Sequence, residues 1–110
     1  MLFRSSVEEY KGMVEVAQAN GLLLNFEPCI MSIALEPAQA ERLVQAVPGL
    51  GYTLDYAHQV QLDYTQEQIE ALHPFARHFH AKQSAPGSFQ ALPDEGTIDF
   101  ARIKIGRAHV

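Results

Sequence analysis

The sequence predicts an α/β fold made of about three parallel βα units. Segments with apolar residues at helical spacing alternate with short apolar segments typical of strands, which is the order expected of a parallel sheet. Residues 22–26 are nearly all apolar, as expected for a parallel strand that is covered on both faces. So few strands cannot close a (β/α)8 barrel, which takes about 250 residues. We therefore interpret the 110-residue chain as part of such a barrel.

The first predicted helix begins near residues 5–9, where two overlapping capping boxes each pair a serine with a glutamate. It ends at Asn20-Gly21, because glycine suits the left-handed cap of a helix. The first strand is predicted over residues 22–26, and Glu27-Pro28 ends it. A loop follows over residues 29–35.

The second predicted helix begins at Pro37, because proline suits the first turn of a helix, and it ends at Pro48-Gly49. The second strand is predicted over residues 52–54 and ends on Asp55. We expect a loop from there through residue 63.

The rest of the chain continues the alternation of helices and strands. Residues 65–68 form a further capping box that begins a third helix, and Pro74 ends or kinks this helix. Residues 77–81 are predicted as the third strand. Residues 84–95 contain proline turn signals and are predicted as a loop, after which residues 96–100 begin a fourth helix.

Composition and charge exclude several classes of protein. A hydrophobic content of 47% with 19% charged residues is ordinary for a globular domain and argues against disorder. The net charge of −5, with scattered Lys and Arg residues, predicts no nucleic-acid partner. No apolar run is long enough to span a membrane and no signal-peptide pattern is present, so no membrane partner is expected. Cys29 is the single cysteine, which excludes an internal disulfide and favours the cytoplasm.

Residues 105–110 differ in kind from the rest of the sequence. They read IGRAHV, which is the translation of a common sequencing-library adapter. We therefore interpret them as not native and keep them out of any functional argument, and we interpret residues 1–104 as the barrel fragment. We also expect the strands at 22–26 and 77–81 to expose apolar edges, which would make the fragment poorly soluble.

Each predicted strand leads into a side chain that can bind a metal ion. Glu27 follows the first strand, Asp55 follows the second, and His80 lies near the end of the third. The carboxyl ends of parallel strands meet at one edge of the sheet, so we expect these side chains to lie close together. Carboxylate and imidazole ligands suit a divalent ion such as Mn²⁺, Mg²⁺, Co²⁺ or Zn²⁺. The alternative is that each residue only caps a strand or binds a loop amide.

Further residues near these strand ends have both functional and purely structural interpretations. His58, in the loop after the second strand, could contact a substrate oxygen or a second metal, or only bind the loop. Lys82 follows His80 on the same side of the strand and could bind a substrate hydroxyl or phosphate, or lie solvated on the surface. His78 is predicted as a core residue, and Cys29 as a packing residue rather than a nucleophile.

Four segments, in this order and spacing, resemble the xylose isomerase-like TIM-barrel superfamily. They are NFEP at residues 25–28, TLDYAH at 53–58, HFHAK at 78–82 and EGTIDF at 95–100. The resemblance covers nearly the whole chain up to Lys104 and implies a partial (β/α)8 TIM barrel. The superfamily includes sugar-phosphate isomerases and epimerases, hydroxypyruvate isomerase, inosose dehydratase and apurinic-site endonucleases.

The resemblance also implies roles for individual residues. Glu27, Asp55 and His80 match metal ligands of the isomerase and epimerase branch, and a further ligand, a glutamate after a later strand, would lie beyond this chain. Glu27 also matches a glutamate that exchanges protons with the sugar carbon, and His58 matches a histidine that approaches substrate oxygens. Cys29 departs from the family pattern, in which a histidine commonly follows the Glu-Pro pair.

The implied function is a divalent-metal-dependent isomerase or epimerase of a sugar, sugar phosphate or polyol, acting by proton transfer through an enediolate. We expect a small-molecule sugar or polyol as the partner, and the parent protein could be a homo-oligomer. The alternatives are an apurinic-endonuclease-like phosphodiesterase or an inosose-dehydratase-like lyase on the same scaffold, and a non-catalytic sugar-binding relative. The fragment itself is expected to be inactive, because one ligand and part of the pocket would lie outside it.

Overall fold

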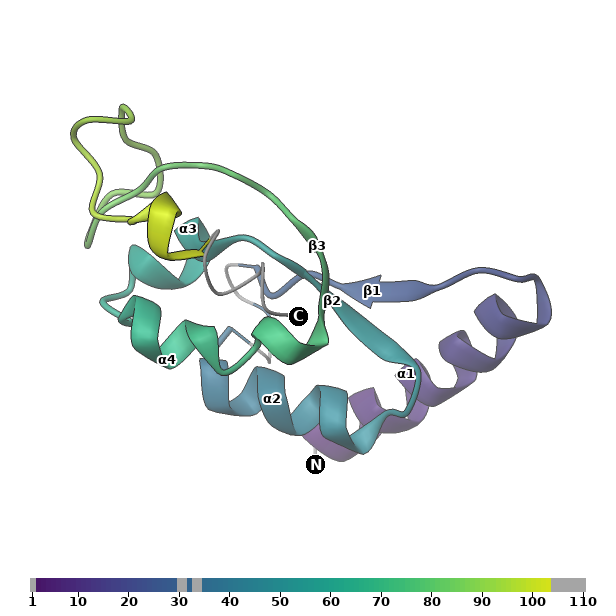
Figure 1. Cartoon of the computed structure of the whole chain (residues 1–110). Coiled ribbons are helices and arrows are strands. Elements are labelled where there is room, and N and C mark those ends of the chain that lie inside the picture. Colours follow the sequence, from purple (N-terminus) through teal and green to yellow (C-terminus); the bar gives the residue numbers. More distant parts are fainter. Residues whose placement is uncertain (1, 30–31, 33–34, 104–110) are drawn as a thin grey trace.

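The computed structural model describes residues 2–29, 32 and 35–103, and its helices and strands alternate along the chain (Figure 1). The predicted adapter-derived residues 105–110 lie outside the described part. A helical turn at residues 100–103 follows the last strand. In chain order the elements are α1 Leu2–Ala19, β1 Leu24–Phe26, α2 Pro37–Ala46, β2 Leu50–Leu54, α3 Tyr56–Val60, α4 Gln66–Glu70, the 3₁₀ helix His73–Phe75 and β3 Ala76–Phe79.

The strands form one parallel sheet in the order β1-β2-β3. Leu24 lies opposite Leu50, and Tyr52 lies opposite Ala76. A register shift after Tyr52 then brings Thr53 opposite His78. This confirms the predicted α/β class with parallel strands, and the described residues form an open sheet rather than a closed barrel.

The apolar core lies between β2 and the helices that pack along the sheet. In Figure 1, α1 and α2 run along the same side of the strands. The Tyr52 ring packs edge-on against Phe26, with the ring centroids 5.9 Å apart, and its hydroxyl donates a hydrogen bond to the carbonyl of Ala40 in α2. Among the large side chains that are fully buried are Leu43, Tyr52, Leu54, Ile69 and Leu72. Burial of these side chains holds the central strand against the helices.

The N-terminal elements differ from their predicted bounds. Helix α1 already begins at Leu2, so the serines of the two predicted capping boxes lie inside the helix, and the predicted start is wrong. Phe3 gives a reason, because its ring packs against the core and lies 4.6 Å from the Arg42 guanidinium, and such tertiary contacts extend helices. Strand β1 is shorter than predicted, because Gly21 has φ +68° and the amide of Leu22 still donates to Ala17 in the helix cap.

The predicted loop after Asp55 contains a helix, α3, that was not predicted. The Asp55 side chain caps this helix, since its Oδ1 accepts a hydrogen bond from the Ala57 amide at 2.9 Å. The predicted capping box at Thr65 is confirmed, with Gln68 as its partner at the start of α4. The chain therefore re-enters a helix directly at the carboxyl end of β2.

Strand β3 ends at Phe79, two residues before the predicted end at Ala81. The amide of His80 still donates to the carbonyl of Leu54 at 3.0 Å, so the chain stays beside β2 where the strand ends. The side chain of His78 is exposed, so its prediction as a core residue is wrong. Its ring lies edge-on to the ring of His80, with the centroids 5.5 Å apart.

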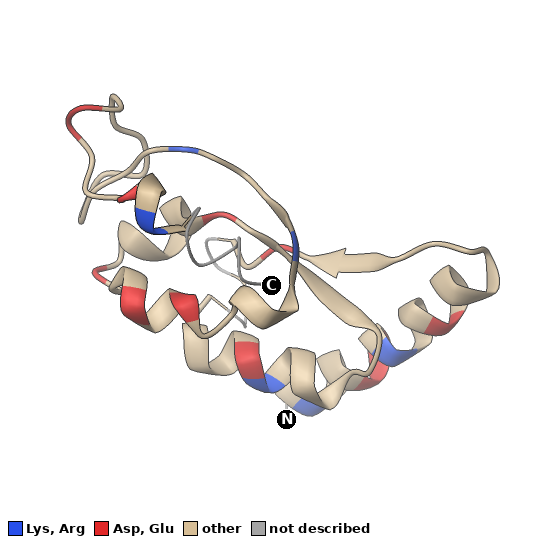
Figure 2. Cartoon of the chain, viewed as in Figure 1, with Lys and Arg blue, Asp and Glu red and all other residues tan. Residues whose placement is uncertain are grey.

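The described basic residues lie on α1, α2, β3, the segment after β3 and the helical turn at residues 100–103, and acidic residues lie on several of the same elements (Figure 2). Arg77 and Arg102 are both bound to groups that are far from them in the sequence. Arg77 donates to the carbonyls of Leu24 and Gly49 at 3.4 and 3.1 Å, and Arg102 forms an ion pair with Glu70. Within the described part of the chain, no helix combines the length and the apolar character needed to cross a membrane.

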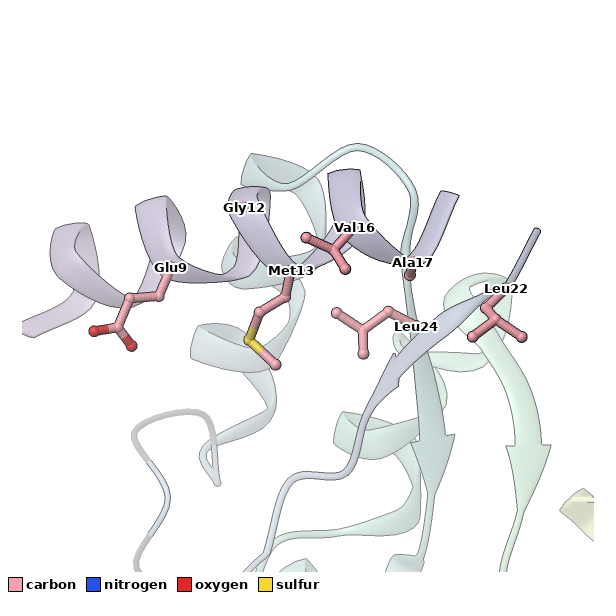
Figure 3. Close-up of a pocket in the computed structure, with 7 residues that line it drawn as sticks. All are labelled: Glu9, Gly12, Met13, Val16, Ala17, Leu22 and Leu24. Carbon is pink, nitrogen blue, oxygen red and sulfur yellow. The ribbon is translucent and has the colours of Figure 1, made fainter. Parts of the chain in front are cut away.

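An apolar groove of about 650 Å³ runs between α1 and β1, lined by Glu9, Gly12, Met13, Val16, Ala17, Leu22 and Leu24 (Figure 3). Val16, Leu22 and Leu23 beside it are 66%, 62% and 74% exposed. Within the described sheet, β1 is an edge strand, so its backbone groups on this side have no partner strand. The predicted apolar edge is therefore present at β1.

We expect the chain to self-associate through this edge and the variant Leu23→Lys to reduce that association. A lysine beside an edge strand opposes pairing with a second copy, and an exposed substitution changes the free energy of unfolding by no more than about 0.5 kcal/mol. Sedimentation velocity over a range of concentrations would measure the effect. Leu62→Lys is the matched control, because Leu62 is 50% exposed and does not adjoin β1 in the sequence, whereas Leu23 directly precedes β1. A wild-type chain that stays monomeric at high concentration would contradict the expectation.

Candidate metal centre

The ends of the three strands bring together the acids and the imidazole that were predicted to meet. Glu27 follows β1, Asp55 follows β2, and His80 follows β3. Nδ1 of His80 lies 3.0 Å from Oε1 of Glu27 and 3.9 Å from Oδ2 of Asp55. The parallel order of the strands is the reason, because it places all three carboxyl ends at one edge of the sheet.

Asp55 lies at the centre of this cluster and is its most buried member, with 4% of its side chain exposed. Its Oδ1 caps helix α3, and its Oδ2 lies within 4 Å of three other side chains. These are His58 Nε2 at 3.8 Å, His80 Nδ1 at 3.9 Å and Lys82 Nζ at 3.8 Å. The Asp55 carboxylate thus has two roles, because one oxygen caps α3 and the other faces the candidate site.

Helix α3 carries His58 into the same cluster. Nε2 of His58 lies 3.8 Å from Oε1 of Glu27 and 3.8 Å from Oδ2 of Asp55. Burial lowers the pKa of the His58 imidazole below its ordinary value, while the neighbouring Asp55 carboxylate opposes the shift. A neutral imidazole at neutral pH has one ring nitrogen that can act as a metal ligand or a proton acceptor.

Lys82 reaches the cluster from the chain that follows β3. Its ammonium lies 3.8 Å from Oδ2 of Asp55 and 3.5 Å from the centre of the Phe89 ring. The Phe89 ring also contacts the His58 imidazole, with centroids 4.8 Å apart. Phe89 was not predicted as a site residue, because a single aromatic residue in a predicted loop carries no spacing signal.

His73 and Cys29 are not among the candidate metal ligands of the described residues. His73, on the 3₁₀ helix, is buried and forms a hydrogen bond with the Tyr56 hydroxyl. Cys29 is exposed, so its prediction as a packing residue is wrong. Pro28, between Cys29 and Glu27, is buried.

The donor set fits a divalent cation. One ligand atom from each of Glu27, Asp55 and His58 lies within 4.8 Å of the other two. His80 adjoins this group through its 3.0 Å contact with Glu27. His58 was expected to contact substrate, but its Nε2 lies close enough to both acids for all three side chains to bind one metal ion. Two carboxylates and two imidazoles are a set that Mn²⁺, Co²⁺ and Zn²⁺ accept.

Comparisons with models of protein families, with curated proteins and with solved structures gave no match. The features of this chain that bear on its function are therefore the chemistry of the cluster and its position at the strand ends.

Proposed function

We propose that this chain carries the metal site of a divalent-metal-dependent isomerase or epimerase that acts on a sugar, sugar phosphate or polyol. We further propose that it belongs to the xylose isomerase-like TIM barrels, as a partial (β/α)8 barrel. The observation that carries the proposal is the cluster of Glu27, Asp55, His58 and His80 at the carboxyl ends of adjacent parallel strands. Active sites of (β/α) enzymes lie at this end of the sheet.

In this proposal the two carboxylates and the two imidazoles hold the ion. A bound divalent ion supplies positive charge that stabilises the negative charge developing on substrate oxygens. Glu27 is 36% exposed, so substrate from solvent can reach it more easily than Asp55, and we assign it the removal and return of the proton. Because Nε2 of His58 faces the two acids, we assign His58 to the ion. Lys82 binds a substrate oxygen and orients the carbon from which the proton is removed.

A titration with Mn²⁺, followed by NMR, tests the metal site. We expect line broadening by the paramagnetic ion to be confined at low occupancy to Glu27, Asp55, His58, His80 and their neighbours. The variant Glu27→Gln removes one ligand charge and is expected to weaken binding by about tenfold or more. Asp94→Asn with Glu95→Gln is the matched control, because both acids are exposed and are not part of the cluster. Broadening centred on Asp94 and Glu95 would overturn the proposed site.

A second measurement tests the substrate class without requiring turnover. Ketoses, ketose phosphates and polyols are added to the Mn²⁺-loaded chain, and the relaxation of their proton signals is measured. A sugar bound beside the ion is expected to show faster relaxation of the protons next to its carbonyl than of the distant ones. Uniform relaxation across every sugar would contradict the proposed substrate class while leaving the metal site intact.

A further inference from the structure

Phe89 covers one side of the metal cluster although it lies outside every predicted motif. Its ring centre lies 3.5 Å from the Lys82 ammonium, and its centroid lies 4.8 Å from that of the His58 ring. A lysine ammonium at this distance over an aromatic face is held by a cation–π interaction. Phe89 thus contacts both Lys82 and His58, and each of these side chains lies 3.8 Å from Oδ2 of Asp55.

The loop that carries Phe89 is fixed in place by backbone hydrogen bonds. Ala85 and Ser88 pair with each other at 3.0 and 2.8 Å around Gly87, which has φ +76°. The Gly87 amide donates to the carbonyl of Gln61 at the end of α3 at 2.7 Å. Because α3 also carries His58, this bond ties the loop with Phe89 to the helix that supplies the imidazole.

Beyond Phe89, the same loop is anchored by Gln83. The backbone carbonyl of Gln83 accepts from the Ala91 amide at 3.0 Å, and its side-chain amide donates to the carbonyl of Ile98 at 3.0 Å. Its side-chain oxygen accepts from the Ile98 amide at 2.9 Å. The backbone is therefore hydrogen-bonded both before and after Phe89, which fixes the position of this residue.

The position of Lys82 between an acid and a ring has a chemical consequence. Its ammonium lies 3.8 Å from Oδ2 of Asp55, which is longer than a hydrogen bond. The ring attracts the ammonium, so the lysine is kept from closing onto the carboxylate. Oδ2 of Asp55 is then left without a hydrogen bond from the ammonium, and the ammonium keeps its donors for a substrate oxygen.

We propose that Phe89 is a positioning residue that holds Lys82 off Asp55 and steadies His58, so that the carboxylate can bind the metal ion. The effect on metal binding rests on the proposed function, but the position of Lys82 can be tested without metal. In the variant Phe89→Leu the lysine is expected to close onto Asp55 and to compete with the ion. Phe89→Tyr keeps the aromatic face and is expected to behave as the wild type.

The metal-free test is NMR spectroscopy of the Lys82 side chain. In the wild type and in Phe89→Tyr, its ε-methylene protons are expected to show an upfield ring-current shift and contacts to the ring protons. In Phe89→Leu the contact of these protons with the β-protons of Asp55 is expected to strengthen. An unshifted ε-methylene signal in the wild type, or an unchanged contact with Asp55 in Phe89→Leu, would overturn the inference whatever the metal does.

The metal test is an Mn²⁺ titration of the same variants. Phe89→Leu is expected to weaken binding by about tenfold, as the loss of an outer contact of a metal site does. The double variant Phe89→Leu with Lys82→Met is expected to recover most of the affinity, because the competing ammonium is gone. Leu92→Ala, on the same loop and 61% exposed, is the control and is expected to bind as the wild type.

These outcomes separate the two proposals. Equal affinity in Phe89→Leu and the wild type, or a weakened Phe89→Leu that Lys82→Met does not restore, overturns the positioning role and leaves the metal site standing. A wild type without Mn²⁺ binding but with the predicted Lys82 contacts overturns the proposed function and supports the positioning of Lys82 by Phe89. Circular dichroism of each variant shows that the fold is kept.

Discussion

Replacing Asp55 with asparagine is expected to weaken Mn²⁺ binding by about 100-fold while the fold stays intact. Oδ2 of Asp55 lies within 4 Å of His58, His80 and Lys82. The substitution therefore removes the negative charge at the centre of the cluster, which attracts the cation. The asparagine side chain still offers an oxygen to the Ala57 amide, and asparagine caps helices about as well as aspartate. Isothermal titration with Mn²⁺ and thermal unfolding of the same sample measure the two effects.

The variant Asp55→Ala separates the two functions of this residue. It removes the charge and also the cap of α3, so it is expected to lose metal binding and in addition about 1 kcal/mol of the free energy of unfolding. Asp55→Asn is the matched control, because it removes the charge alone. If Asp55→Asn bound Mn²⁺ as tightly as the wild type, Asp55 would not be a ligand and the proposed site would be lost.

Replacing Tyr52 with alanine is expected to have the largest effect on stability. The side chain is fully buried, and it packs against Phe26 and bonds to the carbonyl of Ala40. Removing a large buried aromatic ring costs about 3–5 kcal/mol, which is a large part of the roughly 5–15 kcal/mol that stabilises a typical domain. Urea unfolding followed by circular dichroism is the measurement, and we expect Tyr52→Ala to unfold at a much lower urea concentration than the wild type.

Tyr52→Phe is the matched control for this prediction. It keeps the ring and removes only the hydroxyl, so the expected loss is about 1 kcal/mol, the typical net contribution of one hydrogen bond. Burial raises the pKa of the Tyr52 hydroxyl far above its ordinary value, so the group stays neutral and donates its hydrogen bond over the whole working range of pH. A Tyr52→Ala chain with nearly wild-type stability would show that the packing between β2 and α2 does not hold the sheet together.

The loss in Tyr52→Ala also bears on the candidate site. Asp55 follows β2 directly, and β2 is the strand that pairs with both β1 and β3. If β2 loses its attachment to α2, the three strand ends no longer share one edge. Mn²⁺ binding is therefore expected to fall together with the folded fraction in Tyr52→Ala and to persist in Tyr52→Phe.

Local patterns in the sequence were enough to predict the parallel sheet and the meeting of Glu27, Asp55 and His80. The alternation of helices and strands indicates parallel strands, and parallel strands end at one edge. The bounds of the elements were less predictable, because tertiary contacts decided them. Phe3 packs against the core and extends α1, whereas the cap at Gly21 delays β1 until Leu24.

The place of His58 and the presence of Phe89 came only from the tertiary structure. The segment after Asp55 was predicted as a loop but forms helix α3, because the Asp55 side chain caps it. This helix places His58 beside the two acids. Phe89 approaches the site through a backbone bond between Gly87 and Gln61, which are far apart in sequence. Patterns of neighbouring residues in the sequence predict neither the place of His58 nor that of Phe89. The meeting of the parallel strand ends, in contrast, follows from the order of the elements alone.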